Sequence, residues 1–111
     1  MSEEKSIWEA DATHPSDSQQ VREALREVVD PELGLSVIAL GLIRDLHIQD
    51  GTQHLKMIMT TPFCPYGPAL LEATRSKAEQ ASGRDTTIEV GMDPWDPSMM
   101  EEGVGAEWGL F

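Results

Sequence analysis

The sequence lacks a second cysteine, and this absence excludes several kinds of site. Cys64 is the one cysteine in 111 residues, so the chain has no internal disulfide and no C-x-x-C pair for structural zinc. No apolar run approaches the ~20 residues that a membrane helix needs, and the N-terminus lacks the basic start and apolar centre of a secretory signal. We therefore expect a soluble, cytoplasmic protein.

Positive charge is also scarce. The chain has 8 Lys and Arg against 20 Asp and Glu, a net charge of −12. Such a chain repels phosphate backbones and anionic membrane surfaces, so the composition predicts no nucleic-acid partner and no membrane partner. Residues 85–111 contain seven acids and no Lys or Arg. This acidic third serves either solubility or the docking of another protein.

The first residues show no pattern typical of a folded element. Residues 1–15 are polar and have no apolar period, which predicts a flexible acidic leader from which Ile7 and Trp8 touch the body. Residues 16–111 then form a single domain, because a chain of this length supports one modest core.

A helix signal follows the leader. Ser16 and Gln19 fit a capping box for a helix over about 17–29, whose apolar residues recur on one face. Asp30-Pro31 ends this helix, because a residue before proline is pushed out of the helical region.

The middle of the chain predicts a hairpin. Apolar and polar residues alternate over 46–48 and 55–59, on either side of a tight turn at Asp50-Gly51.

The segment "PFCPYGP" then precedes a second helix. This helix begins close behind Cys64, with Pro65 as its possible first residue, and ends at Gly83, a suitable left-handed cap. A third strand, "TTIEVG", follows, and Asp96 caps a short helix that starts at Pro97.

The order helix, strand, strand, helix, strand, short helix predicts an α/β (α+β) fold. We expect a two-layer domain in which helices pack on a small mixed three-stranded sheet. The link from the second strand to the third contains a helix, so it is not a tight hairpin, and it should cross right-handed if those strands are parallel.

Cys64 is the candidate functional residue. A lone cysteine is by default a small buried hydrophobe, but a position at a helix start favours the thiolate. The negative field of the chain opposes this effect, so the direction of the pKa shift stays open.

Three chemistries compete for this thiol. Nucleophilic catalysis needs a base, and His14, His47 and His54 are poorly placed for it, because one is in the leader and two flank the hairpin turn. Dithiol redox chemistry needs a second cysteine. Metal or persulfide handling remains, but an iron-sulfur cluster typically takes four protein ligands. A second copy, a partner or a small thiol would have to complete the shell, and a homodimer is the simplest route.

Three stretches together resemble a known family. They are "VVDPELGLSVIALGLIRDLHI", "MIMTTPFCPYGPALLE" and "VGMDPWDPSMMEEGVGAEWGL", and they resemble the SufT/PaaD-like (MIP18-type) proteins of iron-sulfur cluster assembly. The matching positions are Asp30, Pro31, Glu32, Leu40, Gly41, Leu42, Cys64, Pro65, Pro94, Trp95, Met100, Gly109 and Leu110. Departures are Ala39 in place of a common acid, Ser36 in place of a frequent Asn, and Ile58 in place of a usual Thr.

The resemblance implies an accessory factor, and not a classical enzyme, that assembles iron-sulfur clusters or delivers them to client apoproteins. Its partners would be the assembly machinery and those clients. Its cofactor would be a transiently bound iron-sulfur cluster or iron, contacted by the Cys64 thiolate. Loss of the acid at Ala39 puts any role of that carboxylate in doubt here.

Other residues have both a functional and a structural interpretation. Hydroxyls of Thr60 and Thr61 could donate to a thiolate or sulfide, and strand propensity explains them nearly as well. Asp30 and Glu32 suit a turn better than a ligand set, and Gly41 indicates a backbone need. For four apolar residues we favour a role in covering the sheet over an exposed patch for a partner protein; these are Trp95, Met99, Met100 and Trp108.

Two alternatives of different class stay open. One is a protein-interaction adaptor in which Cys64 is structural and the acidic C-terminal third docks a client. The other is a cysteine-dependent enzyme, which requires a thiol of low pKa and an assisting histidine.

Overall fold

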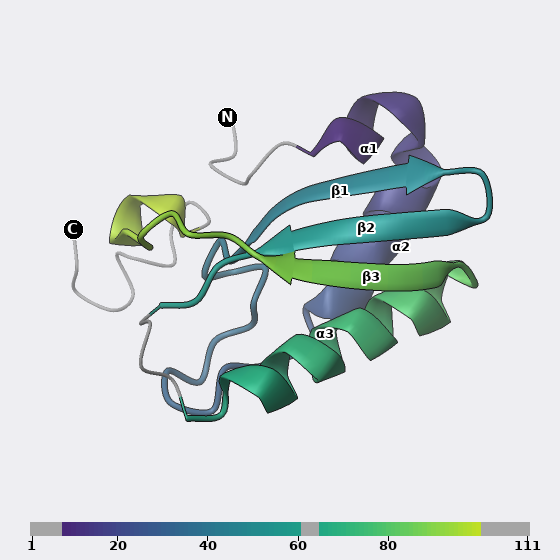
Figure 1. Ribbon diagram of the computed structural model, residues 1–111. Helices are drawn as coiled ribbons and strands as arrows, with labels where there is room; N and C mark the ends of the chain where they lie inside the picture. Colours follow the sequence, from purple (N-terminus) through teal and green to yellow (C-terminus); the bar gives the residue numbers. More distant parts are fainter. Residues whose placement is uncertain (1–7, 61–64, 101–111) are drawn as a thin grey trace.

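The computed structural model describes residues 8–60 and 65–100 and contains a mixed sheet (Figure 1). Its strands are β1 (Ile43–Gln49), β2 (Thr52–Met57) and β3 (Asp85–Val90), in the spatial order β1-β2-β3. β1 pairs with β2 antiparallel and β2 pairs with β3 parallel. The predicted hairpin and the predicted three-stranded mixed sheet are therefore confirmed.

The helices form the second layer. They are α1 (Glu9–Thr13), α2 (Pro15–Leu25) and α3 (Gly67–Ser82), followed by the 3-10 turn η1 (Pro97–Met99). α2 and α3 pack against each other, whereas α1 packs on β1 and α2 (Figure 1). No helix among residues 8–60 and 65–100 is long and apolar enough to cross a membrane.

The core lies between the two layers. Alternate residues of β2 are buried, namely Gln53, Leu55 and Met57. The Gln53 amide nitrogen donates to the carbonyl of Ala78 on α3, at 3.0 Å. This face of the sheet is therefore the one that α3 covers.

Residues 8–15 differ from the predicted flexible leader, although the predicted contact of Trp8 with the body is confirmed. Trp8 is only 2% exposed, its indole N–H donates to the carbonyl of Ile43 at 3.1 Å, and the Arg22 guanidinium lies 3.7 Å from the centre of its ring. Asp11 pairs with Arg22 at 2.9 Å. These contacts are specific to tertiary structure, so a five-residue helix with no apolar period escaped the sequence analysis. Residues 1–7 lie outside the described part.

α2 begins and ends earlier than predicted. His14 is its N-cap residue and Pro15 its first residue, so the Ser16 capping box is wrong; proline suits this first helical position. The helix ends at Leu25, and a tighter turn follows, in which the Val28 N–H donates to the Leu25 carbonyl.

α3 begins at Gly67, with Tyr66 as N-cap residue, and not at Pro65. Its predicted end is confirmed, since Gly83 adopts φ +73°. The Asp96 carboxylate accepts from the Ser98 N–H at 2.9 Å, so the predicted cap is present, on a single 3-10 turn.

Candidate functional site

The Asp-Pro-Glu turn is organised by one carboxylate. Asp30 is 1% exposed, and its Oδ1 accepts hydrogen bonds from the N–H groups of Glu32 at 2.8 Å and Leu33 at 3.1 Å. The Asp30 N–H donates to the Leu35 carbonyl at 2.9 Å. The turn interpretation of Asp30 is therefore supported.

Tyr66 connects this turn to the segment that contains Cys64. Its hydroxyl lies 3.0 Å from Asp30 Oδ1 and 2.9 Å from Glu32 Oε1. Tyr66 is also the N-cap residue of α3 and follows the exposed Pro65. The structure thus brings Asp30 and Glu32 to the residue two positions after Cys64.

Sequence reasoning missed Tyr66. The one available signal was its identity as the single tyrosine of the chain, two residues after the single cysteine.

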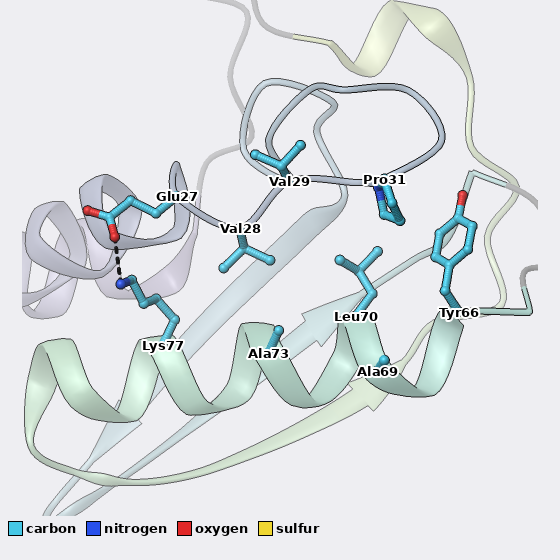
Figure 2. Close-up of a pocket in the computed structure, with 9 residues that line it drawn as sticks. All are labelled: Glu27, Val28, Val29, Pro31, Tyr66, Ala69, Leu70, Ala73 and Lys77. Carbon is cyan, nitrogen blue, oxygen red and sulfur yellow. Dashed lines mark ion pairs between the residues drawn. The ribbon is translucent and has the colours of Figure 1, made fainter.

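A groove of about 410 Å³ lies between the Asp-Pro-Glu turn and α3 (Figure 2). We call it the turn groove. An ion pair between Lys77 Nζ and Glu27 Oε1, at 2.6 Å, lies at one end, and Tyr66 lies at the other. Its remaining lining residues are apolar: Val28, Val29, Pro31, Ala69, Leu70 and Ala73.

A second concavity of about 410 Å³ lies where β2 and β3 end. We call it the strand-end hollow; it is lined by Met59, Thr60, Val90, Gly91, Met92, Asp93, Pro94 and Trp95. Thr60 is half-buried. Thr60 is therefore a lining residue of this hollow and the last described residue before the segment 61–64.

Gly41 allows the backbone of Met99 to approach closely. Its φ is +75°, and a Cβ built there would lie 2.0 Å from the carbonyl oxygen of Met99. The prediction that Gly41 meets a backbone requirement is confirmed.

The apolar residues near the C-terminal end of the described part contact the core. Trp95 donates to the Leu40 carbonyl at 2.8 Å, Met100 is buried, and Trp95 and Met99 pack on the core. The core interpretation holds for these three; Trp108 lies outside the described residues.

The histidines of the hairpin face each other across β1 and β2. His47 Nδ1 lies 2.6 Å from Glu9 Oε1, and this hydrogen bond raises the pKa of His47 above its ordinary value. His54 Nε2 lies 2.7 Å from Glu89 Oε1. His47 is two residues before the end of β1 and His54 two residues after the start of β2, so both lie toward the β1–β2 turn, whereas Thr60 follows the other end of β2.

Cys64 and Thr61 lie outside the described residues, so their predicted roles stay predictions. Within residues 8–60 and 65–100, no group of three or more His, Asp or Glu could hold a metal ion. Asp30 and Glu32 therefore do not form a metal site with described neighbours.

The fold and these contacts define a class of small α+β domain. In this chain a Cys-Pro segment joins the end of the central strand to a helix, and an Asp-Pro-Glu turn contacts the start of that helix. A model of the family described as iron-sulfur cluster assembly protein matches residues 18–90, and the chain belongs to that family. The resemblance seen in the sequence is confirmed.

Individual proteins support this membership. The chain is 33% identical over 78 residues to the Fe-S protein maturation auxiliary factor YitW of Bacillus subtilis, covering 68% of this chain and 76% of that protein. It is 44% identical over 48 residues to an iron-sulfur cluster carrier protein of Synechocystis, covering 43% of this chain and 14% of that protein. A solved structure of a conserved hypothetical protein of Thermotoga maritima is similar with a TM-score of 0.71 and 30% identity, covering 98% and 99% of the two chains.

Proposed function

We propose that this protein is an accessory factor that assembles iron-sulfur clusters or delivers them to client proteins, with Cys64 as the contacting thiolate. The family match carries the proposal, because it spans residues 18–90 and so includes both Cys64 and the Asp-Pro-Glu turn. The relatives named as a maturation factor and a cluster carrier support it.

The geometry around the undescribed segment is consistent with this role. Thr60 precedes the segment at the end of the sheet, and Tyr66 follows it as the N-cap residue of α3. The first amides of a helix have no internal partner, and the positive end of its dipole favours an anion. The bonds from Tyr66 to Asp30 and Glu32 hold this helix start in place.

The cluster is cargo in this proposal. The described residues hold no three-ligand group, and a cluster typically takes four protein ligands. Ligands from a second copy, from the assembly machinery or from the client apoprotein would complete the shell. Such sharing of ligands suits transient binding of the cluster. We place the protein in the cytoplasm.

The rival class is an adaptor, in which Cys64 is structural. The two apolar concavities favour it, because each offers a surface for another protein. A cysteine enzyme is less well supported, because both hairpin histidines lie toward the β1–β2 turn and bond to glutamates.

Anaerobic reconstitution with ferrous iron and sulfide tests the proposal. Wild type, Cys64→Ser and Ser76→Ala are compared by visible absorption, by iron per chain and by mass in solution. Ser76 lies on α3, is not among the residues that line either concavity, and serves as the control. We expect cluster absorption in wild type and Ser76→Ala and its loss in a folded Cys64→Ser. If all three stay colourless and Cys64→Ser retains client binding, the adaptor becomes the better account.

A further inference from the structure

One edge of the sheet is open among the described residues. β3 pairs with β2 and with no other described strand. The Gly91 N–H donates to the Met57 carbonyl at 2.7 Å, and in a parallel ladder the groups of alternate residues point to the same side. The N–H and C=O groups of Ile88 and Val90 therefore point away from β2.

The first part of this edge is covered. Arg75 on α3 donates to the Thr86 carbonyl at 3.4 Å. The open stretch thus begins at Ile88 and continues past the end of the strand.

Apolar side chains border the open stretch. Val90 is 47% exposed and Met92 is 93% exposed. Both line the strand-end hollow. Ile88, on the same face as Val90, packs on the core. An added strand would therefore find an apolar surface on the Val90 face.

The charge at this edge is negative. Described residues 85–100 contain four acids, Asp85, Glu89, Asp93 and Asp96, and no Lys or Arg. Three bases lie nearby. Lys56 is opposite Glu89 on β2, and His54 Nε2 lies 2.7 Å from Glu89 Oε1. Arg75, at the start of the edge, pairs with Glu72 and Glu79 on its own helix, so it leaves the acids of β3 in excess. A second copy would bring the same four acids against this edge, in a chain of net charge −12, so charge opposes self-pairing here.

We propose that the edge from Ile88 to Met92 binds an extended basic segment of a partner protein by strand addition. Backbone bonds to Ile88 and Val90 supply the affinity, as in other strand-addition complexes. Successive side chains of the added strand alternate between faces. Apolar residues on one face of the added strand meet Val90 and Met92, and Lys or Arg residues on the other face meet Glu89. Asp93, which lines the strand-end hollow beside Met92, adds negative charge there.

This inference names how a client or assembly protein is held, and its biological meaning rests on the proposed function. The binding itself involves neither iron nor Cys64. Cys64→Ser should therefore bind the segment as wild type does, even if it fails to hold a cluster.

The probe is the peptide acetyl-Gly-Val-Lys-Leu-Lys-Val-Gly-amide, titrated into the full ¹⁵N-labelled chain. We expect amide shifts concentrated at Ile88, Val90 and Met92. Binding should weaken as salt rises from about 0.1 M to about 1 M, because the Debye length falls from about 10 Å to about 3 Å. A peptide with Glu in place of Lys, and one with N-methylated amides on alternate residues, should not bind.

Two exposed valines provide a matched pair of variants. Val90 and Val29 are both 47% exposed, one at the strand-end hollow and the other in the turn groove. Val90→Lys should weaken binding by about tenfold or more, because it removes the apolar contact with the peptide and adds positive charge to the edge that binds a cationic peptide. Val29→Lys should leave binding unchanged.

Several results would overturn the inference. These are no binding to wild type, equal binding by Val90→Lys, loss of binding in Val29→Lys, shifts confined to the turn groove, or retained binding of the N-methylated peptide. A dimer whose mass is lost in Val90→Lys would instead assign the edge to a second copy.

Discussion

Gly41 and Gly34 share a backbone conformation but differ in their surroundings. Their φ angles are +75° and +73°; a Cβ on Gly41 would meet the Met99 carbonyl at 2.0 Å, and one on Gly34 would meet nothing within 4 Å. Gly34→Ala should lower the free energy of unfolding by about 1–2 kcal/mol, the cost of a left-handed alanine.

Gly41→Ala should cost about 3 kcal/mol or more, because the segment around Met99 must also move. Urea denaturation at neutral pH measures both variants. Equal losses would mean that the Gly41–Met99 approach contributes nothing to stability.

The Tyr66 hydroxyl bonds to two carboxylates with a single proton. Tyr66→Phe should lower the free energy of unfolding by about 1–2 kcal/mol, since a hydrogen bond to a charged group is worth more than a neutral one. The same substitution in a Glu32→Gln background separates the share of Glu32 from that of Asp30. An unchanged stability in both backgrounds would contradict the role of Tyr66 as a link between turn and helix.

These residues show the limit of local patterns. Asp30 and Glu32 were identified because a turn signal is local, with Asp30 bonding to residues two and three positions on. Tyr66 was missed because its partners lie 36 and 34 positions away. No spacing rule reports contacts at that separation.

Among the elements, α1 depends most on its neighbours. Five residues are too few for a stable isolated helix, and α1 is held by Trp8 and by Asp11, which pairs with the buried Arg22. By contrast, the hairpin and α3 carry their own signals in alternation, turn residues and helix length. This difference explains why the sequence predicts the hairpin and α3 but not α1.

Acid should loosen α1. Burial raises the pKa of Asp11, but hydrogen bonds from the Ser18 hydroxyl, the Trp8 N–H and Arg22 more than offset it, so the pKa lies below its ordinary 3.8. The ion pair therefore stabilises the fold at any pH above the ordinary pKa of the carboxyl group. This contribution is lost as the pH falls through the lowered pKa of Asp11 in the folded state.

Asp11→Asn isolates this contribution. At neutral pH it should cost about 1–3 kcal/mol, because the guanidinium of Arg22 loses its carboxylate. The difference from wild type should shrink at acid pH, and urea unfolding as a function of pH measures it. If the difference in the free energy of unfolding between wild type and Asp11→Asn did not change with pH, the negative charge of Asp11 would contribute nothing to stability.

Across the entire chain, repulsion between acids opposes folding. The net charge is −12, and several described ion pairs, such as that of His54 with Glu89, are well exposed. Salt screens both attraction and repulsion, but the excess of one sign makes repulsion the larger effect.

Raising potassium chloride from about 0.1 M to about 1 M should therefore raise Tm, by roughly 4–8 °C for each kcal/mol gained. Calorimetry or circular dichroism measures the shift, and an equal concentration of a neutral sugar is the control for non-ionic effects. A fall in Tm with salt would mean that the ion pairs outweigh the excess charge.

The amino-acid sequence was sufficient for the fold class, the hairpin, the end of α3, the Asp-Pro-Glu turn and the family. Each of these depends on residues close together in the chain, such as turn and cap residues, or on a pattern of residue types along it, such as the alternation of the hairpin and the motifs of the family. Four features required the folded chain: the bond from Trp8 to the Ile43 carbonyl, the bond from Tyr66 to Asp30, the approach of Met99 to Gly41, and the edge of β3 that no other described strand covers. They arise from contacts between distant segments, whose geometry depends on how the layers pack, and periodicity carries no record of that packing.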